Sequence, residues 1–182
     1  YQRGYDWKSV NFEALWQDIN YCIDNKKPLF LGTVIFQETK DNNIGSNLSY
    51  HVVDGQQRLT TMTIFLTALR RTLQERLAVE QVPSAKSLLL TQSEIINMKY
   101  LNVVDGLGET VRQRLNGTTY KKKKIVDALN YICASDWQGD FPNQAEINGE
   151  QKRLTLQFSR FKSVFDDFFN KLSIKNSEEE YE

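Results

Sequence analysis

Five consecutive residues, Asp54-Gly55-Gln56-Gln57-Arg58, bring an acid, two amides and a guanidinium together next to a glycine. Amide and guanidinium groups donate several hydrogen bonds, and a carboxylate can position a water molecule directly or through a metal ion. Glycine can adopt a positive φ or let a ligand approach the backbone closely. These residue types favour a phosphate site with Asp54, Gln57 and Arg58 as candidate catalytic residues. The candidates for ligand binding at the same turn are Gly55, Gln56, Gln57, Arg58 and Thr61.

The flanking sequence predicts a strand before this turn and a helix after it. Tyr50 to Val53 is rich in β-branched and aromatic residues, as strands are. Downstream, apolar residues recur every three or four positions, which is typical of an amphipathic helix of roughly five turns. The first turn of a helix has unpaired N–H groups and the positive end of the macrodipole, so the junction suits an anion. The apolar stripe of this helix consists of Leu59, Met62, Leu66, Leu69, Leu73 and Leu77.

A purely structural interpretation of the turn is also open. Asp54 could cap the helix, and Arg58 could be a surface cation that pairs with it four residues along. The residue types alone do not decide between this interpretation and a phosphate site.

Three stretches, in order along the N-terminal part of the chain, resemble the motifs of a known prokaryotic family. Asp54 to Thr61 resembles the DGQQRLTT signature of GmrS-type N-terminal domains, which occur in modification-dependent restriction systems and related phage-defence proteins. Tyr1 to Trp7 resembles the YQRxYxW opening of that family, and Phe30-Leu31-Gly32 resembles its FLG strand. The rest of the chain carries no comparable motif.

The resemblance implies a core similar to the ParB/sulfiredoxin fold, which binds a nucleoside triphosphate. With this resemblance, we expect Gln2 and Arg3 to face the nucleotide from the opposite side, and from the Asp54 carboxylate we infer Mg²⁺ near that residue. Hydrolysis would be coupled to cleavage of plain or modified DNA, with a nuclease domain in cis or in trans. The sequence lacks a GxxxxGK[ST] stretch, so the mechanism would not be that of a P-loop enzyme. Two alternatives stay open: a switch that binds nucleotide or DNA backbone without turnover, and a scaffold whose chemistry lies in a partner domain.

The charge balance restricts how nucleic acid could be bound. Lys+Arg and Asp+Glu both number 23 in the 182 residues, so binding would have to use a local patch rather than a global basic field. The one local cluster could contact phosphates or simply be a solvated face. It consists of Arg112, Arg114, Lys121, Lys122, Lys123 and Lys124.

Other compositional features exclude several classes. No apolar run is long enough for a membrane span, and two cysteines with a single histidine give no common zinc-site spacing. Cys22 and Cys133 are predicted to be reduced, buried thiols, which indicates a cytoplasmic protein. His51 alternates with Val52 and is predicted to be structural rather than a general base.

The periodicities predict an α+β fold with a small mixed sheet in the ParB/sulfiredoxin-like core, followed by a mainly helical C-terminal part. We divide the chain into a nucleotide-binding core, residues 1–80, and an extension, residues 81–182. Helices are predicted over 11–24, 109–115 and 150–172. An antiparallel hairpin is predicted from a buried strand at 29–37 and a second strand at 48–53, and a further strand pair from 88–91 and 98–104.

Overall fold

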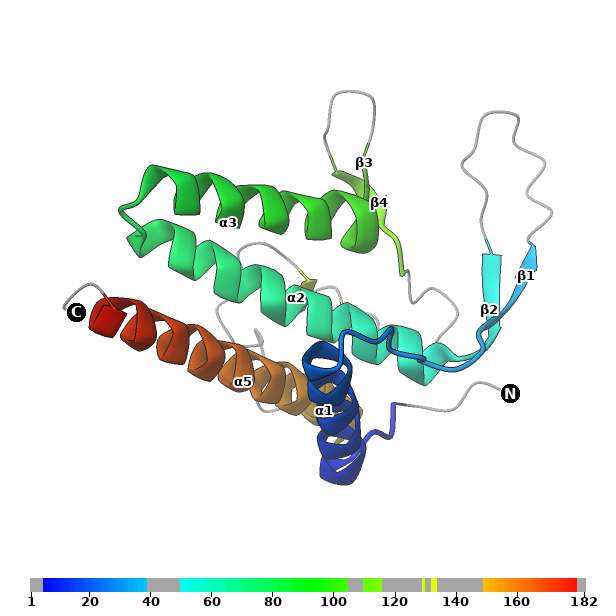
Figure 1. Ribbon diagram of the computed structural model, residues 1–182. Coiled ribbons are helices and arrows are strands. Elements are labelled where there is room, and N and C mark those ends of the chain that lie inside the picture. The colour runs from blue at the N-terminus through cyan, green and yellow to red at the C-terminus, as the bar shows by residue number, and fades with distance from the viewer. Residues whose placement is uncertain are drawn as a thin grey trace. The chain divides into compact units, whose positions relative to one another are not determined.

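The computed structural model describes residues 5–38, 50–104, 110–115, 129, 132–133 and 149–179. Figure 1 shows helices together with two small sheets, so the predicted α+β class is confirmed. Each sheet is a two-stranded antiparallel pair, β1 with β2 and β3 with β4. The elements in order are α1 (Ser9–Asp24), β1 (Ile35–Glu38), β2 (Tyr50–Asp54), α2 (Gln56–Val79), α3 (Pro83–Ile96), the π-helical turn η1 (Asn97–Leu101), β3 (Asn102–Val104), β4 (Thr110–Gln113) and α5 (Gly149–Glu179).

The chain forms two compact units. One is Asp6–Thr61, and the other combines Tyr1–Tyr5 with Met62–Glu182. The boundary falls inside α2, because the first turns of this helix belong to the smaller unit and the remainder to the larger one. The division at residue 80 that the sequence suggested stays a prediction.

In the smaller unit, α1 follows its apolar periodicity. Phe12, Leu15 and Ile19 are buried at spacings of three and four residues, as one face of an α-helix requires. At the helix start, the side-chain oxygen of Asn11 accepts the backbone N–H of Lys8 at 2.9 Å. The helix predicted over 11–24 is therefore confirmed, with two additional residues at its beginning.

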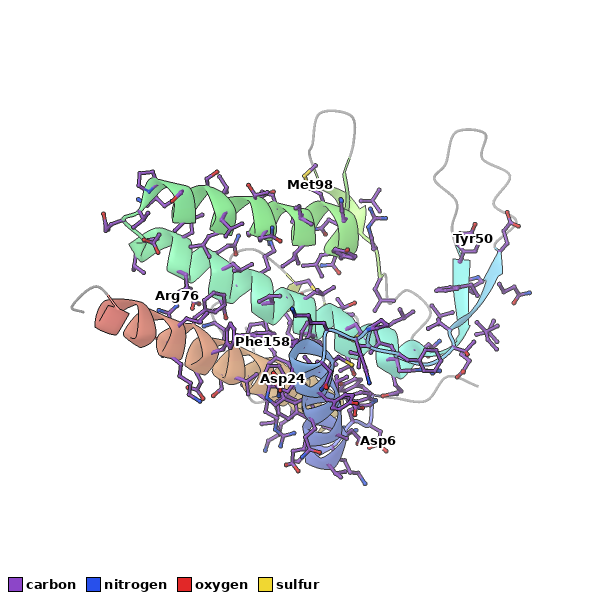
Figure 2. The ribbon with its side chains drawn as sticks, viewed as in Figure 1. Asp6, Asp24, Tyr50, Arg76, Met98 and Phe158 are labelled. Carbon is purple, nitrogen blue, oxygen red and sulfur yellow. The ribbon has the colours of Figure 1, made fainter. Side chains whose placement is uncertain are left out.

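The hairpin that leads to the turn is antiparallel, as predicted, with Ile35 opposite Asp54. The prediction of a buried strand from residue 29 is wrong on two counts. The strand starts at Ile35, because Gly32 has a φ of 85° and interrupts the extended backbone. Every residue of β1 is exposed, since within its sheet β1 contacts only β2. In Figure 2, Tyr50 lies at the end of the hairpin farther from the start of α2.

In the larger unit, α2 runs between α3 and α5 (Figure 1). On one side, Leu73 of α2 packs with Ile96 and Leu101. On the other side, the ring of Phe65 packs edge-on against Phe161 and Phe165 of α5, with centroid distances of 5.2 and 5.1 Å. The apolar surface of α2 is therefore divided between two neighbouring helices.

Polar contacts reinforce the contact between α2 and α5. The ammonium of Lys162 lies 2.5 Å from Glu75 and 2.7 Å from Asp166, and Asp166 also accepts the hydroxyl of Thr72. Further along, Arg76 donates to the side-chain oxygen of Asn170, and Figure 2 labels Arg76 on the part of α2 that faces α5.

Two predicted elements of the larger unit are wrong. Residues 88–91 are not a strand but the middle of α3, which begins with Pro83 at its first position, where proline is well tolerated because no N–H is needed there. Residues 109–115 are not a helix: β4 occupies Thr110–Gln113 and pairs with β3. The strand predicted over 98–104 is reduced to Asn102–Val104, because η1 continues the helical path after α3.

The aromatic stripe of α5 provides a matched test of this packing. Phe161 is completely buried, whereas Phe168 on the same helix is 54% exposed. Phe161→Ala should lower the free energy of unfolding by about 3–5 kcal/mol, because it removes a buried ring and leaves a cavity. Phe168→Ala should lower it by less than about 1 kcal/mol. Urea unfolding followed by circular dichroism measures both values; equal effects would contradict the packing described.

Candidate functional site

The turn between β2 and α2 depends on glycine. Gly55 has a φ of 92°, and its carbonyl accepts the N–H of Leu59 at 3.0 Å, so Gly55 occupies the position that begins α2. A Cβ atom at Gly55 would lie 2.9 Å from the side chain of Val34. The absence of a side chain therefore serves both the backbone conformation and the close packing of segment 32–34 against the turn.

The guanidinium of Arg58 has two neighbours, the Asp54 carboxylate and the backbone of Gly32. One guanidinium nitrogen, Nη2, donates to the Asp54 carboxylate at 3.1 Å. The other, Nη1, lies so close to Gly32 that a Cβ there would be 2.2 Å away. Gly32 also has a positive φ of 85°. The structure thus brings the DGQQR and FLG motifs together, because the guanidinium of Arg58 lies next to the backbone of Gly32.

The amide side chains stabilise the turn through the backbone. Gln56 donates its Nε2 to the carbonyl of Val52 at 3.0 Å, which links the first turn of α2 to β2. Gln57 accepts the backbone N–H of Asp6 through Oε1 at 3.1 Å, which links the N-terminal segment to the turn. These two contacts fix the turn relative to the elements on either side of it.

Thr61 has its side chain inside the fold. It is fully buried, and its hydroxyl donates to the carbonyl of Gln57 at 2.8 Å. The charged groups of the turn are more accessible: the side chain of Asp54 is 66% exposed and that of Arg58 is 31% exposed. The turn therefore presents a carboxylate and a guanidinium to solvent at the start of a helix, where the macrodipole favours negative charge.

The geometry bears on the structural interpretation of the turn. The pair between Asp54 and Arg58 at a spacing of four residues is present, as that interpretation expects. The position of helix cap belongs to Gly55 rather than to Asp54. An exposed pair of this kind contributes at most about 0.5 kcal/mol to stability, so the pair is a minor stabilising element.

The remaining candidates lie elsewhere. Gln2, Arg3 and Lys121 to Lys124 are outside the described residues. Arg112 pairs with Val103 in the β3–β4 sheet. Arg114 donates Nη2 to the carbonyl of Met98 at 3.1 Å, and Figure 2 shows Met98 next to the C-terminal end of α3. Arg114 thus binds the carbonyl end of the α3–η1 helical path, which supports the helix dipole there.

The part of the chain that the structure describes contains no metal cluster, and Cys22 and Cys133, predicted to be buried, are free thiols of intermediate exposure. No group of three or more His, Cys, Asp or Glu residues there could hold a metal ion. His51 is exposed on β2 opposite Gln37. Desolvation raises the pKa of the Cys133 thiol to about 11, although a hydrogen bond with Thr67 and the charge of Arg70 act in the opposite direction. Cys133 is therefore protonated at neutral pH.

The contact between Gly32 and Arg58 is the feature of the site that residue-by-residue reasoning missed. The sequence identified Gly32 as the last residue of the FLG motif. It gave no indication that the approaching group is the guanidinium of Arg58, because the two residues are distant along the chain. The only signal in the sequence was the order of the three family motifs along the chain.

The fold and the turn define an α+β domain that exposes an acid–arginine pair where a strand passes into a long helix. The sequence model of the GmrSD restriction endonuclease N-terminal domain family matches residues 1–182, and the chain belongs to this family. It is therefore a component of a restriction endonuclease system. Comparison with curated proteins finds no match. None of the helices among the described residues has both the length and the apolar character needed to cross a membrane.

The close approach of Arg58 to Gly32 can be tested by a double-mutant cycle. Gly32→Ala should destabilise the protein by about 1–2 kcal/mol because of its left-handed backbone, and further because the new methyl group displaces the guanidinium. In an Arg58→Ala background the second contribution should vanish, which gives a measurable coupling energy in denaturant unfolding. Strict additivity would contradict the contact. Gly149→Ala is a matched control, because a Cβ there meets Arg153 at an ordinary 3.8 Å.

The protonation state of Cys133 predicts its reactivity and a pH dependence. In the native protein the Cys133 thiol should resist a thiol reagent at pH 8 and react only after unfolding. Because the folded pKa of about 11 exceeds the ordinary 9.0, its contribution to stability is fully present below pH 9 and is lost as the pH rises towards 11. Mass spectrometry after timed labelling measures the first effect. Rapid labelling of Cys133 in the folded protein would contradict this assignment.

Proposed function

We propose that the turn from Asp54 to Arg58 binds the phosphates of a nucleoside triphosphate and hydrolyses it, and that hydrolysis is coupled to DNA cleavage. Membership of the GmrSD restriction endonuclease N-terminal domain family supports a role in a DNA-targeting system. The residue chemistry of the turn supports an anion as its ligand. Within the restriction system, the nuclease activity would reside in a domain in cis or in trans.

The observation that carries the proposal is the position of Arg58. Its guanidinium donates to the Asp54 carboxylate and approaches the backbone at Gly32, at the first turn of α2. A cation next to the bound phosphates can stabilise charge that develops on a phosphoryl group.

Each residue of the turn has a role in this proposal. Asp54 orients or activates the attacking water molecule, and Arg58 neutralises charge on the phosphates. Gln56 and Gln57 keep the turn rigid through their backbone hydrogen bonds.

The donor set fits Mg²⁺ as a companion of the nucleotide. Mg²⁺ is usually bound through one or two carboxylates together with substrate phosphates and water, so a single exposed carboxylate is sufficient. Asp54, with its side chain 66% exposed, is the residue that would hold the ion. Bound there, the ion would neutralise phosphate charge.

A switch without turnover is the second candidate, and the ion pair itself favours it. A phosphate that binds Arg58 competes with the Asp54 carboxylate for the same guanidinium, so binding would rearrange the pair. A ligand that favours one arrangement of the turn shifts the population towards it even when no bond is cleaved.

Asp54→Asn separates these functions. The substitution should change the free energy of unfolding by no more than about 0.5 kcal/mol, because the Asp54–Arg58 pair is exposed. It should nevertheless abolish release of phosphate from nucleoside triphosphates. Asp24→Asn, at an exposed carboxylate on α1 of the same unit, is the matched control and should keep full activity. Unchanged turnover in Asp54→Asn would remove Asp54 from the mechanism.

Thermal unfolding with and without the nucleotide, beside phosphate release, distinguishes enzyme from switch. Ligand at 100 times its Kd should stabilise the native protein by about 2.7 kcal/mol in either case. Stabilisation with phosphate release supports hydrolysis, and stabilisation without release supports the switch. Absence of any shift at millimolar nucleotide would overturn both.

A further inference from the structure

Phe30 is the most exposed large apolar side chain in the described part of the chain, with 86% of its surface accessible. Within the same compact unit, Phe12 is buried. A single exposed apolar residue is common on protein surfaces and by itself needs no explanation. The position of Phe30 relative to the turn is what makes it informative.

Phe30 is close to the point where Arg58 approaches Gly32. It precedes Gly32 by two residues, and consecutive Cα atoms are about 3.8 Å apart, so the two Cα atoms are at most about 7.6 Å apart. Gly32 is in direct contact with the guanidinium of Arg58. Phe30 thus lies on the same short segment as the glycine that the Arg58 guanidinium approaches.

Phe30 and Arg58 have complementary chemistry for two parts of one ligand. A phenyl ring carries no charge and no hydrogen-bond donor, so it offers nothing to a phosphate. It does offer a flat π surface on which any nucleobase can stack. Leu31, which is 39% exposed, adds apolar surface next to the ring.

We infer that Phe30 is the platform on which the base of the bound nucleotide stacks while its phosphates contact Arg58. This inference rests on the proposed nucleotide site and names the part of the ligand that Phe30 recognises. Since every base has a π face, the platform binds adenine and guanine nucleotides alike, and selectivity for one base arises elsewhere. Stacking also covers an apolar ring that water otherwise surrounds.

The test compares a nucleotide with its phosphate chain alone. Isothermal titration calorimetry measures binding of β,γ-imido analogues of ATP and GTP, and of inorganic tripolyphosphate, to the wild-type chain and to Phe30→Ala. Because Phe30 is exposed, the substitution leaves the fold intact, which equal thermal unfolding midpoints verify. Phe30→Tyr keeps a stacking ring and Phe30→Leu keeps only apolar volume. Phe168→Ala, an exposed phenylalanine of the other unit, is the matched control.

We expect Phe30→Ala to bind both nucleotide analogues about 10-fold more weakly and tripolyphosphate as tightly as the wild-type chain does. Phe30→Tyr should restore affinity, Phe30→Leu should not, and Phe168→Ala should behave as wild type. Equal weakening for the nucleotides and tripolyphosphate would overturn the inference, because Phe30 would then act through Arg58. Unchanged nucleotide affinity in Phe30→Ala would also overturn it and would leave the phosphate site standing. If the wild-type chain binds neither probe, the proposed function itself fails.

Discussion

The contact of the Arg58 guanidinium with the backbone at Gly32 is the constraint on which the rest of the site depends. A Cβ at position 32 would displace the guanidinium, and the φ of 85° there also favours glycine; the same segment, through Val34, packs against the strand-to-helix turn. The turn in turn requires glycine at position 55, since Val34 fills the space that a Cβ would occupy. Without this contact, Arg58 would be a long, flexible side chain with considerable rotamer entropy to lose on binding a ligand. With it, part of that entropy has already been lost on folding.

Local signals predicted the elements around the site well. The heptad-like spacing of apolar residues located α1 and α2, and the β-branched run before Asp54 located β2. These patterns involve residues close together in the sequence, so they do not depend on contacts with the rest of the fold. The pairing of Asp54 with Arg58 is equally local, because residues four apart on a helix are neighbours.

The failures have tertiary causes. The sequence around Leu88 has three consecutive leucines, which fit a strand as well as a helix, and only the proline at position 83 favoured the helix. Burial along α2 was also misjudged, because Ile64 and several threonines are more deeply buried than most of the leucine stripe. Buried threonines escape a hydrophobicity pattern, yet they fit here because partners such as the carbonyl of Thr63 accept their hydroxyls. Contacts between distant segments, such as Gly32 with Arg58, have no periodic signature at all.

The continuity of α2 has a mechanical consequence. Its first residues complete the turn that holds Arg58, and its later residues pack with α3 and α5 in the other unit. At 1.5 Å per residue, its 24 residues form an uninterrupted rod of roughly 36 Å. An α-helix resists bending and stretching far more than a loop does. The residues that complete the turn and the residues that pack against α5 therefore belong to one continuous helix.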